Sequence, residues 1–133
     1  MIDILLDTIL PNDNIKNILS KIFNLDCDEI FVCHINELSE IIIDDSIQCL
    51  CATFGVDGDA RKMLQIYRIK VDINPVFLEK IKEVSEEYHI SLFIPYGDFD
   101  DYYKISKGNT IQNVKLNECK SDDSCYYFCK SVF

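Results

Sequence analysis

The chain has 133 residues, of which 48% are hydrophobic and 11% aromatic, and its formal net charge is −10 at pH 7. This composition excludes a disordered chain, and the length fits one domain, residues 1–133. The negative charge disfavours binding to nucleic acids and anionic membranes, and no apolar run approaches the roughly 20 residues that a membrane-spanning helix needs. Acid at Asp3 and Asp7 replaces the basic start of a signal peptide, so we expect a soluble, cytoplasmic protein.

The first third of the chain predicts a strand, a helix and a second strand. Residues 2–6 and 29–35 are rich in β-forming side chains and are predicted as strands. The run Pro11-Asn12-Asp13-Asn14 predicts a helix cap. An apolar stripe at helical spacing follows it: Ile15, Ile18, Leu19, Ile22 and Phe23. Residues 36–43 fit either a short helix or an extended segment.

A β-hairpin is predicted next. Two strand-like runs, 47–56 and 63–73, flank Asp57-Gly58-Asp59, and Asp-Gly is the strongest short hairpin signal. In the second run, apolar and polar residues alternate from 67 to 73, which predicts one buried and one solvated face.

The remaining elements are a second helix and several strands. Asn74 is predicted as its cap and Pro75 as its first residue. The apolar stripe of this helix is Phe77, Ile81, Val84 and Tyr88. Further strands are predicted at 91–94, 102–105, 111–116 and 125–132. The order predicts an α+β fold: a mostly antiparallel sheet with two main helices packed on one face. Residues 2–94 are compatible with a ferredoxin-like core, to which the C-terminal strands would be added.

The cysteines and histidines do not form a recognisable catalytic or metal site. Of the seven cysteines, Cys119, Cys125 and Cys129 are spaced without any CxxC pair, so zinc is not predicted. Cys33 and His34 are adjacent and would point to opposite faces of a strand, so they cannot act as nucleophile and base. We therefore predict free thiols, no cofactor and no enzymatic activity.

Acidic residues are concentrated in short clusters at predicted turns. The largest, Asp98-Phe99-Asp100-Asp101, lacks the glycine and glutamate of an EF-hand, and Asp57-Gly58-Asp59 is explained by turn chemistry. A further cluster is Asp122 and Asp123. The stretch 96–103 allows two interpretations. It either presents carboxylates beside rigid aromatic anchors for a basic partner, or it is a solvated turn whose aromatic side chains point inward.

In its size, acidity, Ile/Asn/Asp-rich composition and acid–aromatic segment from Asp98 to Tyr103, the chain resembles bacterial immunity proteins of contact-dependent growth-inhibition and polymorphic toxin systems. The resemblance implies that the protein neutralises a cognate toxin domain, typically a nuclease with a basic cleft, by binding it through an acidic surface. The residues expected to bind the toxin are, in order of priority, Asp98, Asp100, Asp101, Tyr102 and Tyr103, then Asp57 and Asp59.

Two other classes of function remain open. One is a small metal-dependent hydrolase that uses clustered aspartates. The other is a non-catalytic adaptor or regulatory subunit, which would expose an apolar patch or form a stable oligomer. Because edge strands of such sheets often pair, we expect a monomer or a weak homodimer.

Overall fold

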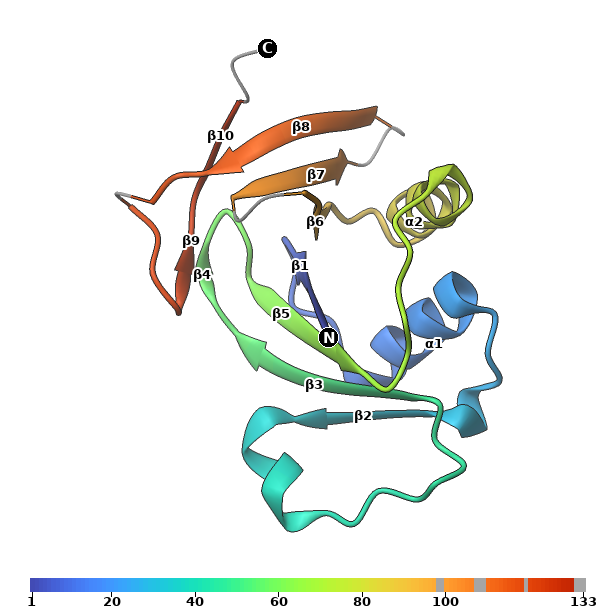
Figure 1. Cartoon of the computed structure of the whole chain (residues 1–133). Coiled ribbons are helices and arrows are strands. Elements are labelled where there is room, and N and C mark those ends of the chain that lie inside the picture. Colours follow the sequence, from blue (N-terminus) through green and yellow to red (C-terminus); the bar gives the residue numbers. More distant parts are fainter. Residues whose placement is uncertain (98–99, 107–109, 119, 131–133) are drawn as a thin grey trace.

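The computed structural model describes residues 1–97, 100–106, 110–118 and 120–130 (Figure 1). Asp98 therefore lies outside the described residues. In chain order the elements are β1 (Ile2–Leu6), α1 (Asn12–Phe23), η1 (Cys27–Glu29), β2 (Ile30–His34), η2 (Ile35–Glu40), β3 (Cys49–Gly55), β4 (Asp57–Gly58), β5 (Lys62–Tyr67), α2 (Pro75–Tyr88), β6 (Leu92–Pro95), β7 (Asp101–Ser106), β8 (Thr110–Leu116), β9 (Cys125–Tyr126) and β10 (Phe128–Lys130).

Eight strands form one sheet in the order β10-β8-β7-β6-β1-β5-β3-β2. All neighbouring pairs are antiparallel except β2 and β3, which are parallel. β4 and β9 form a separate two-stranded parallel sheet. The predicted α+β class is thus confirmed.

The connectivity around β1 is that of two interlocked split β-α-β units. β1 and β3 both run antiparallel to β5, which lies between them, and α1 precedes β3 in the chain. β5 and β6 likewise flank β1 and are joined through α2. This arrangement is ferredoxin-like. β2 is an additional edge strand, and β7, β8 and β10 extend the sheet at the other end.

The two faces of the sheet have separate cores. Both helices lie on one side of the sheet and pack on it through aliphatic side chains (Figure 1), and we call the larger cluster that they form with the strands the main core. The predicted stripes are buried, including Ile15 and Ile18 of α1 and Ile81 and Val84 of α2. On the other side, a smaller cluster, which we call the second core, consists of Leu5, Val56, Ala60, Met63, Phe93, Tyr102 and Val114.

Two local predictions need correction. The second hairpin arm ends at Tyr67 and not at 73, because Arg68 takes a left-handed φ of 70° that interrupts the strand. α1 begins after Pro11 with no side-chain cap, so the asparagines do not cap it. In contrast, Asn74 caps α2 as predicted, with its side chain accepting a hydrogen bond from the Phe77 N–H at 2.9 Å.

The hairpin between β3 and β5 is confirmed, but its connection is not a tight turn. Asp57 and Gly58 form β4, which pairs with β9 instead of reversing the chain directly. The local pairing of β3 with β5 is therefore joined by a long-range pairing of β4 with β9, and Asp59 and Phe128, which are bonded across it, are 69 residues apart. This contact positions the candidate site.

Candidate partner-binding surface

Two acidic segments that are far apart in the sequence, 57–59 and 122–123, meet at β9, where β4 pairs with it (Figure 1). The Asp57 N–H donates to the Ser124 carbonyl at 2.8 Å, and the Asp59 N–H donates to the Tyr126 carbonyl at 2.7 Å. The Asp59 carboxylate accepts a further hydrogen bond from the Phe128 N–H at 2.8 Å. The loop from 56 to 61 is thus held to the C-terminal strands by backbone bonds and one carboxylate.

Glycine is required at position 58 by this contact. Gly58 has φ of +101°, and a Cβ atom there would lie 2.3 Å from the Tyr126 carbonyl oxygen. A side chain at this position would therefore clash with backbone that cannot move without breaking the β4–β9 pairing. The positive φ expected of an Asp-Gly pair is present, but it serves a close approach of two segments.

The turn before β9 brings two more carboxylates to the same surface. Asp122 accepts hydrogen bonds from the Ser124 N–H at 2.8 Å and from the Ser124 hydroxyl at 3.0 Å, and these bonds lower the pKa of its carboxyl group. Asp123 is exposed beside it. Asp122 therefore stabilises the turn in its charged form, whereas the Asp123 side chain makes no hydrogen bond within the described part of the chain.

A carboxylate pair forms the third part of the surface. The side chains of Asp100 and Glu118 share a hydrogen bond, which raises the pKa of Glu118. Asp100 is positioned by its carbonyl, which accepts a hydrogen bond from the Leu116 N–H at 2.8 Å. Two like charges held this close are stabilised by a shared proton or by a cation.

We define the acidic surface as the six residues Asp57, Asp59, Asp100, Glu118, Asp122 and Asp123. All except Asp100 are exposed, and Asp100 is half-buried. A shallow hollow of about 260 Å³ lies between Glu118, Asp122, Asp123 and Tyr126. The positive charge of Lys115 acts on Glu118 and opposes the rise in its pKa, so the surface is acidic but not exclusively so.

The aromatic residues proposed as anchors are turned away from this surface. Tyr102 is only 9% exposed and belongs to the second core, where its ring meets Phe128 edge-on at 5.0 Å. Tyr103, on the opposite face of β7, packs against the main core and stacks on Tyr96 at 3.9 Å. The aromatic part of the segment thus has the inward arrangement that the second interpretation described.

Other tyrosines are found beside the carboxylates. Tyr127 is 37% exposed. Its pKa is raised by a hydrogen bond with the Cys125 side chain and by the charges of Asp59 and Asp57. Burial and the neighbouring groups Tyr102, Asp3, Asp123 and Asp122 raise the pKa of Tyr126 to about 12. Tyr127 is therefore a partly exposed aromatic side chain close to Asp57 and Asp59, at a position that was not predicted from the sequence.

A partly buried carboxylate lies close to Tyr102 and Tyr126. Asp3, on β1, has one side-chain oxygen that is buried and has no hydrogen-bond partner. Burial raises its pKa, and its charge in turn raises the pKa of Tyr102 and Tyr126. Asp3 and these two tyrosines therefore form a polar group within the otherwise apolar second core.

The described residues contain no cluster of three or more His, Cys, Asp or Glu side chains arranged to hold a metal ion. Six cysteines in this part of the chain are free, and Cys33, Cys49 and Cys51 are buried, with burial raising the pKa of Cys49 to about 11. Cys49 and Cys51 lie on one face as predicted. High thiol pKa values make these side chains poor nucleophiles.

Of the seven residues predicted to contact a partner, Asp57 and Asp59 lie at β9, and Asp100 lies beside Glu118. Asp101 begins β7 opposite Lys115 and is half-buried. Glu118, Asp122 and Asp123 could not be assigned to this surface from the sequence, because no local sequence pattern predicts that β4 pairs with β9.

Searches against protein-family models, curated proteins and solved structures found no match to this chain. No helix within the described ranges has the length and apolar character needed to cross a membrane.

Proposed function

We propose that this protein is an immunity-type inhibitor that captures a basic toxin domain through its acidic surface. The observation that supports the proposal is the grouping of carboxylates from three segments around the β4–β9 contact. Asp57 and Asp59 are bonded to β9 through their backbone, and Glu118, Asp122 and Asp123 line one hollow next to it, with Asp100 beside Glu118. The fold class and acidity fit this function, and the surface supplies a specific location for the contact.

The physical basis is electrostatic. A net charge of −10 attracts a basic domain over distances up to the Debye length, about 10 Å at 0.1 M salt. Such attraction raises the association rate, which is the decisive quantity when a toxin must be captured before it acts. After docking, carboxylates that pair with partner lysines or arginines slow dissociation.

The Asp100–Glu118 pair gives the surface a preferred anchoring point. In the free protein the two side chains share a hydrogen bond and Glu118 has a raised pKa. A partner guanidinium placed between the two oxygens would replace the shared proton and form charge-assisted hydrogen bonds with both residues. We therefore expect an arginine of the partner to lie at this pair.

The function is tested by a rescue assay. The C-terminal domain of the protein encoded directly upstream is expressed with and without this chain, and growth is recorded. We expect the domain to stop growth and this chain to restore it through a direct complex. A harmless domain, or one against which the chain gives no protection, would remove the basis for the proposal.

The surface is tested separately with matched charge reversals. Asp57→Lys with Asp123→Lys alters two exposed side chains that form no hydrogen bonds within the described residues. Glu83→Lys with Glu86→Lys makes the same charge change on exposed positions of α2. We expect the first pair to weaken toxin binding by more than about tenfold and the second by less than about threefold. Equal losses would mean that net charge matters and this surface does not.

A further inference from the structure

The segment between β5 and α2 has the sequence of a strand but no strand partner. Residues 69–73 continue the apolar–polar alternation of β5, and in Figure 1 they run as an open stretch from the end of β5 to the start of α2. Within the described part of the chain, these residues make no backbone or side-chain hydrogen bond. Backbone groups without a protein partner are bonded to water, and a partner strand can replace that water, so this edge can accept a partner.

One side of the segment is fixed to the protein. Ile69, Val71 and Ile73 are half-buried against the main core, whereas Lys70 and Asp72 are exposed. This alternation is that of a strand with one face on a hydrophobic layer. The segment is therefore already held in place, and a chain that paired with it would not have to order it first.

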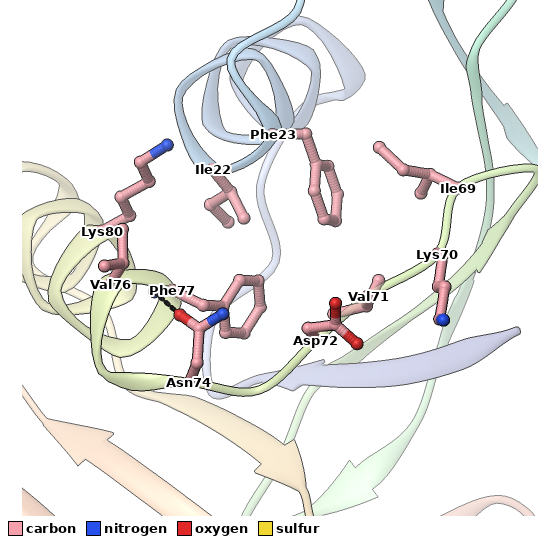
Figure 2. Close-up of a pocket in the computed structure, with 10 residues that line it drawn as sticks. All are labelled: Ile22, Phe23, Ile69, Lys70, Val71, Asp72, Asn74, Val76, Phe77 and Lys80. Atoms are coloured by element: carbon pink, nitrogen blue, oxygen red, sulfur yellow. Dashed lines mark hydrogen bonds between the residues drawn. The ribbon is translucent and has the colours of Figure 1, made fainter.

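A groove of about 280 Å³ runs beside the segment. Figure 2 shows the rings of Phe23, at the end of α1, and Phe77, in α2, directed into the same space, with Ile22 beside them. The two ring centroids are 6.3 Å apart. Val76, which also borders the groove, is 67% exposed. Six of the ten residues that line the groove are apolar and four are polar or charged, and part of the apolar surface is open to solvent.

The backbone of the segment borders this groove. The four consecutive residues 69–72 all line it, although their side chains alternate between the core and solvent. Successive side chains of an extended segment point in opposite directions, so four consecutive residues can border the same groove only if their backbone also borders it. The unpaired edge and the apolar groove therefore form one continuous site.

The charges at the groove are different from those of the protein as a whole. Lys70 and Lys80 lie on opposite sides of the groove in Figure 2, and neither forms an ion pair with another described residue. Asp72 is the acidic residue among those that line the groove. A net positive rim on a chain of charge −10 favours an occupant that carries carboxylates.

From these features we infer that the groove binds an extended segment of a partner protein by strand addition to residues 69–73. The occupant carries apolar side chains that enter the groove, alternating with carboxylates that pair with Lys70. Main-chain hydrogen bonds provide affinity and the apolar pockets provide selectivity, as in other cases of strand addition. This site is distinct from the acidic surface and selects the opposite charge.

The inference is tested with an acetylated, amidated hexapeptide of alternating valine and glutamate. NMR titration should show a dissociation constant below about 1 mM, with shifts concentrated at residues 69–73 and at Val76. A peptide of the same sequence with methylated backbone nitrogens, and one with lysine in place of glutamate, should each bind more than about tenfold more weakly. Amide exchange at some of residues 69–73 should slow when the first peptide is bound.

Two proline variants provide an internal control. Lys70→Pro and Val71→Pro each remove an N–H group that has no hydrogen bond in the protein, and successive N–H groups of a strand point to opposite edges. One variant should therefore weaken peptide binding by more than about fivefold while the other leaves it within about twofold. Thermal unfolding of both variants confirms that the fold is intact.

Several outcomes would overturn the inference: no peptide binding at millimolar concentration, equal binding of the N-methylated peptide, or shifts away from the groove. Slow amide exchange at residues 69–73 in the free protein would show that the edge is already paired. If the wild type sediments as a dimer and Val71→Pro or Lys70→Pro sediments as a monomer, the occupant is a second copy of this chain, which would also contradict the inference.

Discussion

The face of the sheet that α1 and α2 cover is packed with aliphatic side chains, whereas the opposite face is closed by the 56–61 loop and the C-terminal strands. The first face is built from two periodic helices and the strands beneath them. The second contains Tyr102, the partly buried carboxylate of Asp3 and, at its outer edge, the acidic surface. The comparison indicates that one face mainly stabilises the fold, while the other holds charged groups in place.

The strongest way to challenge this division is to remove one large side chain from each face. Leu64 is 1% exposed in the main core, and Leu64→Ala should lower the unfolding free energy of the protein by about 3–4 kcal/mol. Phe128, in β10, is half-buried, and Phe128→Ala should lower the unfolding free energy by about 1–2 kcal/mol. Urea unfolding of both variants measures the difference. Equal losses would mean that the C-terminal closure supports the fold as much as the helices do.

A smaller effect is expected at the contact between β4 and β9. Gly58→Ala should lose about 2–3 kcal/mol, because the new Cβ would meet the Tyr126 carbonyl. Gly97→Ala is the matched control: Gly97 also has a positive φ, of +60°, but an added Cβ meets no atom of the described residues within 4 Å. Its cost should be about 1 kcal/mol.

Hydrogen exchange locates the effect of Gly58→Ala. The amides of Asp57, Asp59 and Phe128, which are bonded across this contact, should exchange faster, while those of α1 and α2 should not change. Faster exchange throughout the molecule would show that the two faces unfold as one unit.

The smallest effect concerns pH. Burial raises the pKa of Asp3 above its ordinary value of 3.8, so the folded protein binds more protons than the unfolded chain between the two pKa values. Stability due to Asp3 is therefore present at low pH and is lost as the pH rises through this window. Asp3→Asn should stabilise the protein at pH 7 by less than about 1 kcal/mol, since the residue is not completely buried, and should have little effect at acidic pH.

Thermal unfolding at several pH values measures this difference, with Asp45→Asn, at an exposed position, as the control. A variant that is less stable than the wild type at pH 7 would show that the charged form of Asp3 has a stabilising partner.

The two faces also differ in how far the sequence predicts them. The stripes of α1 and α2 and the Asn74–Pro75 start of α2 are local patterns, and each was confirmed. The exit of residues 69–73 from the sheet was missed, because the alternation persists after Arg68 reverses the sign of φ. The position of Asp57-Gly58-Asp59 depends on a contact with Tyr126, and no local pattern in either segment specifies it.

The candidate site follows the same rule. Asp100 and the 57–59 acids were recognised by composition, yet their neighbours Glu118 and Asp122 join them only through the fold. Burial of Tyr102 was likewise undetermined, because a tyrosine at a strand position has equal reason to face the core or a partner.

The central claim is tested most directly by the association rate between this protein and the upstream-encoded domain proposed as its toxin, measured by stopped flow at low and at physiological salt. For the wild type and for Glu83→Lys with Glu86→Lys, the rate should fall by at least about tenfold between the two conditions. For Asp57→Lys with Asp123→Lys, it should be slow at both. A rate that is independent of salt, or one that the two double variants reduce equally, would contradict capture through the acidic surface.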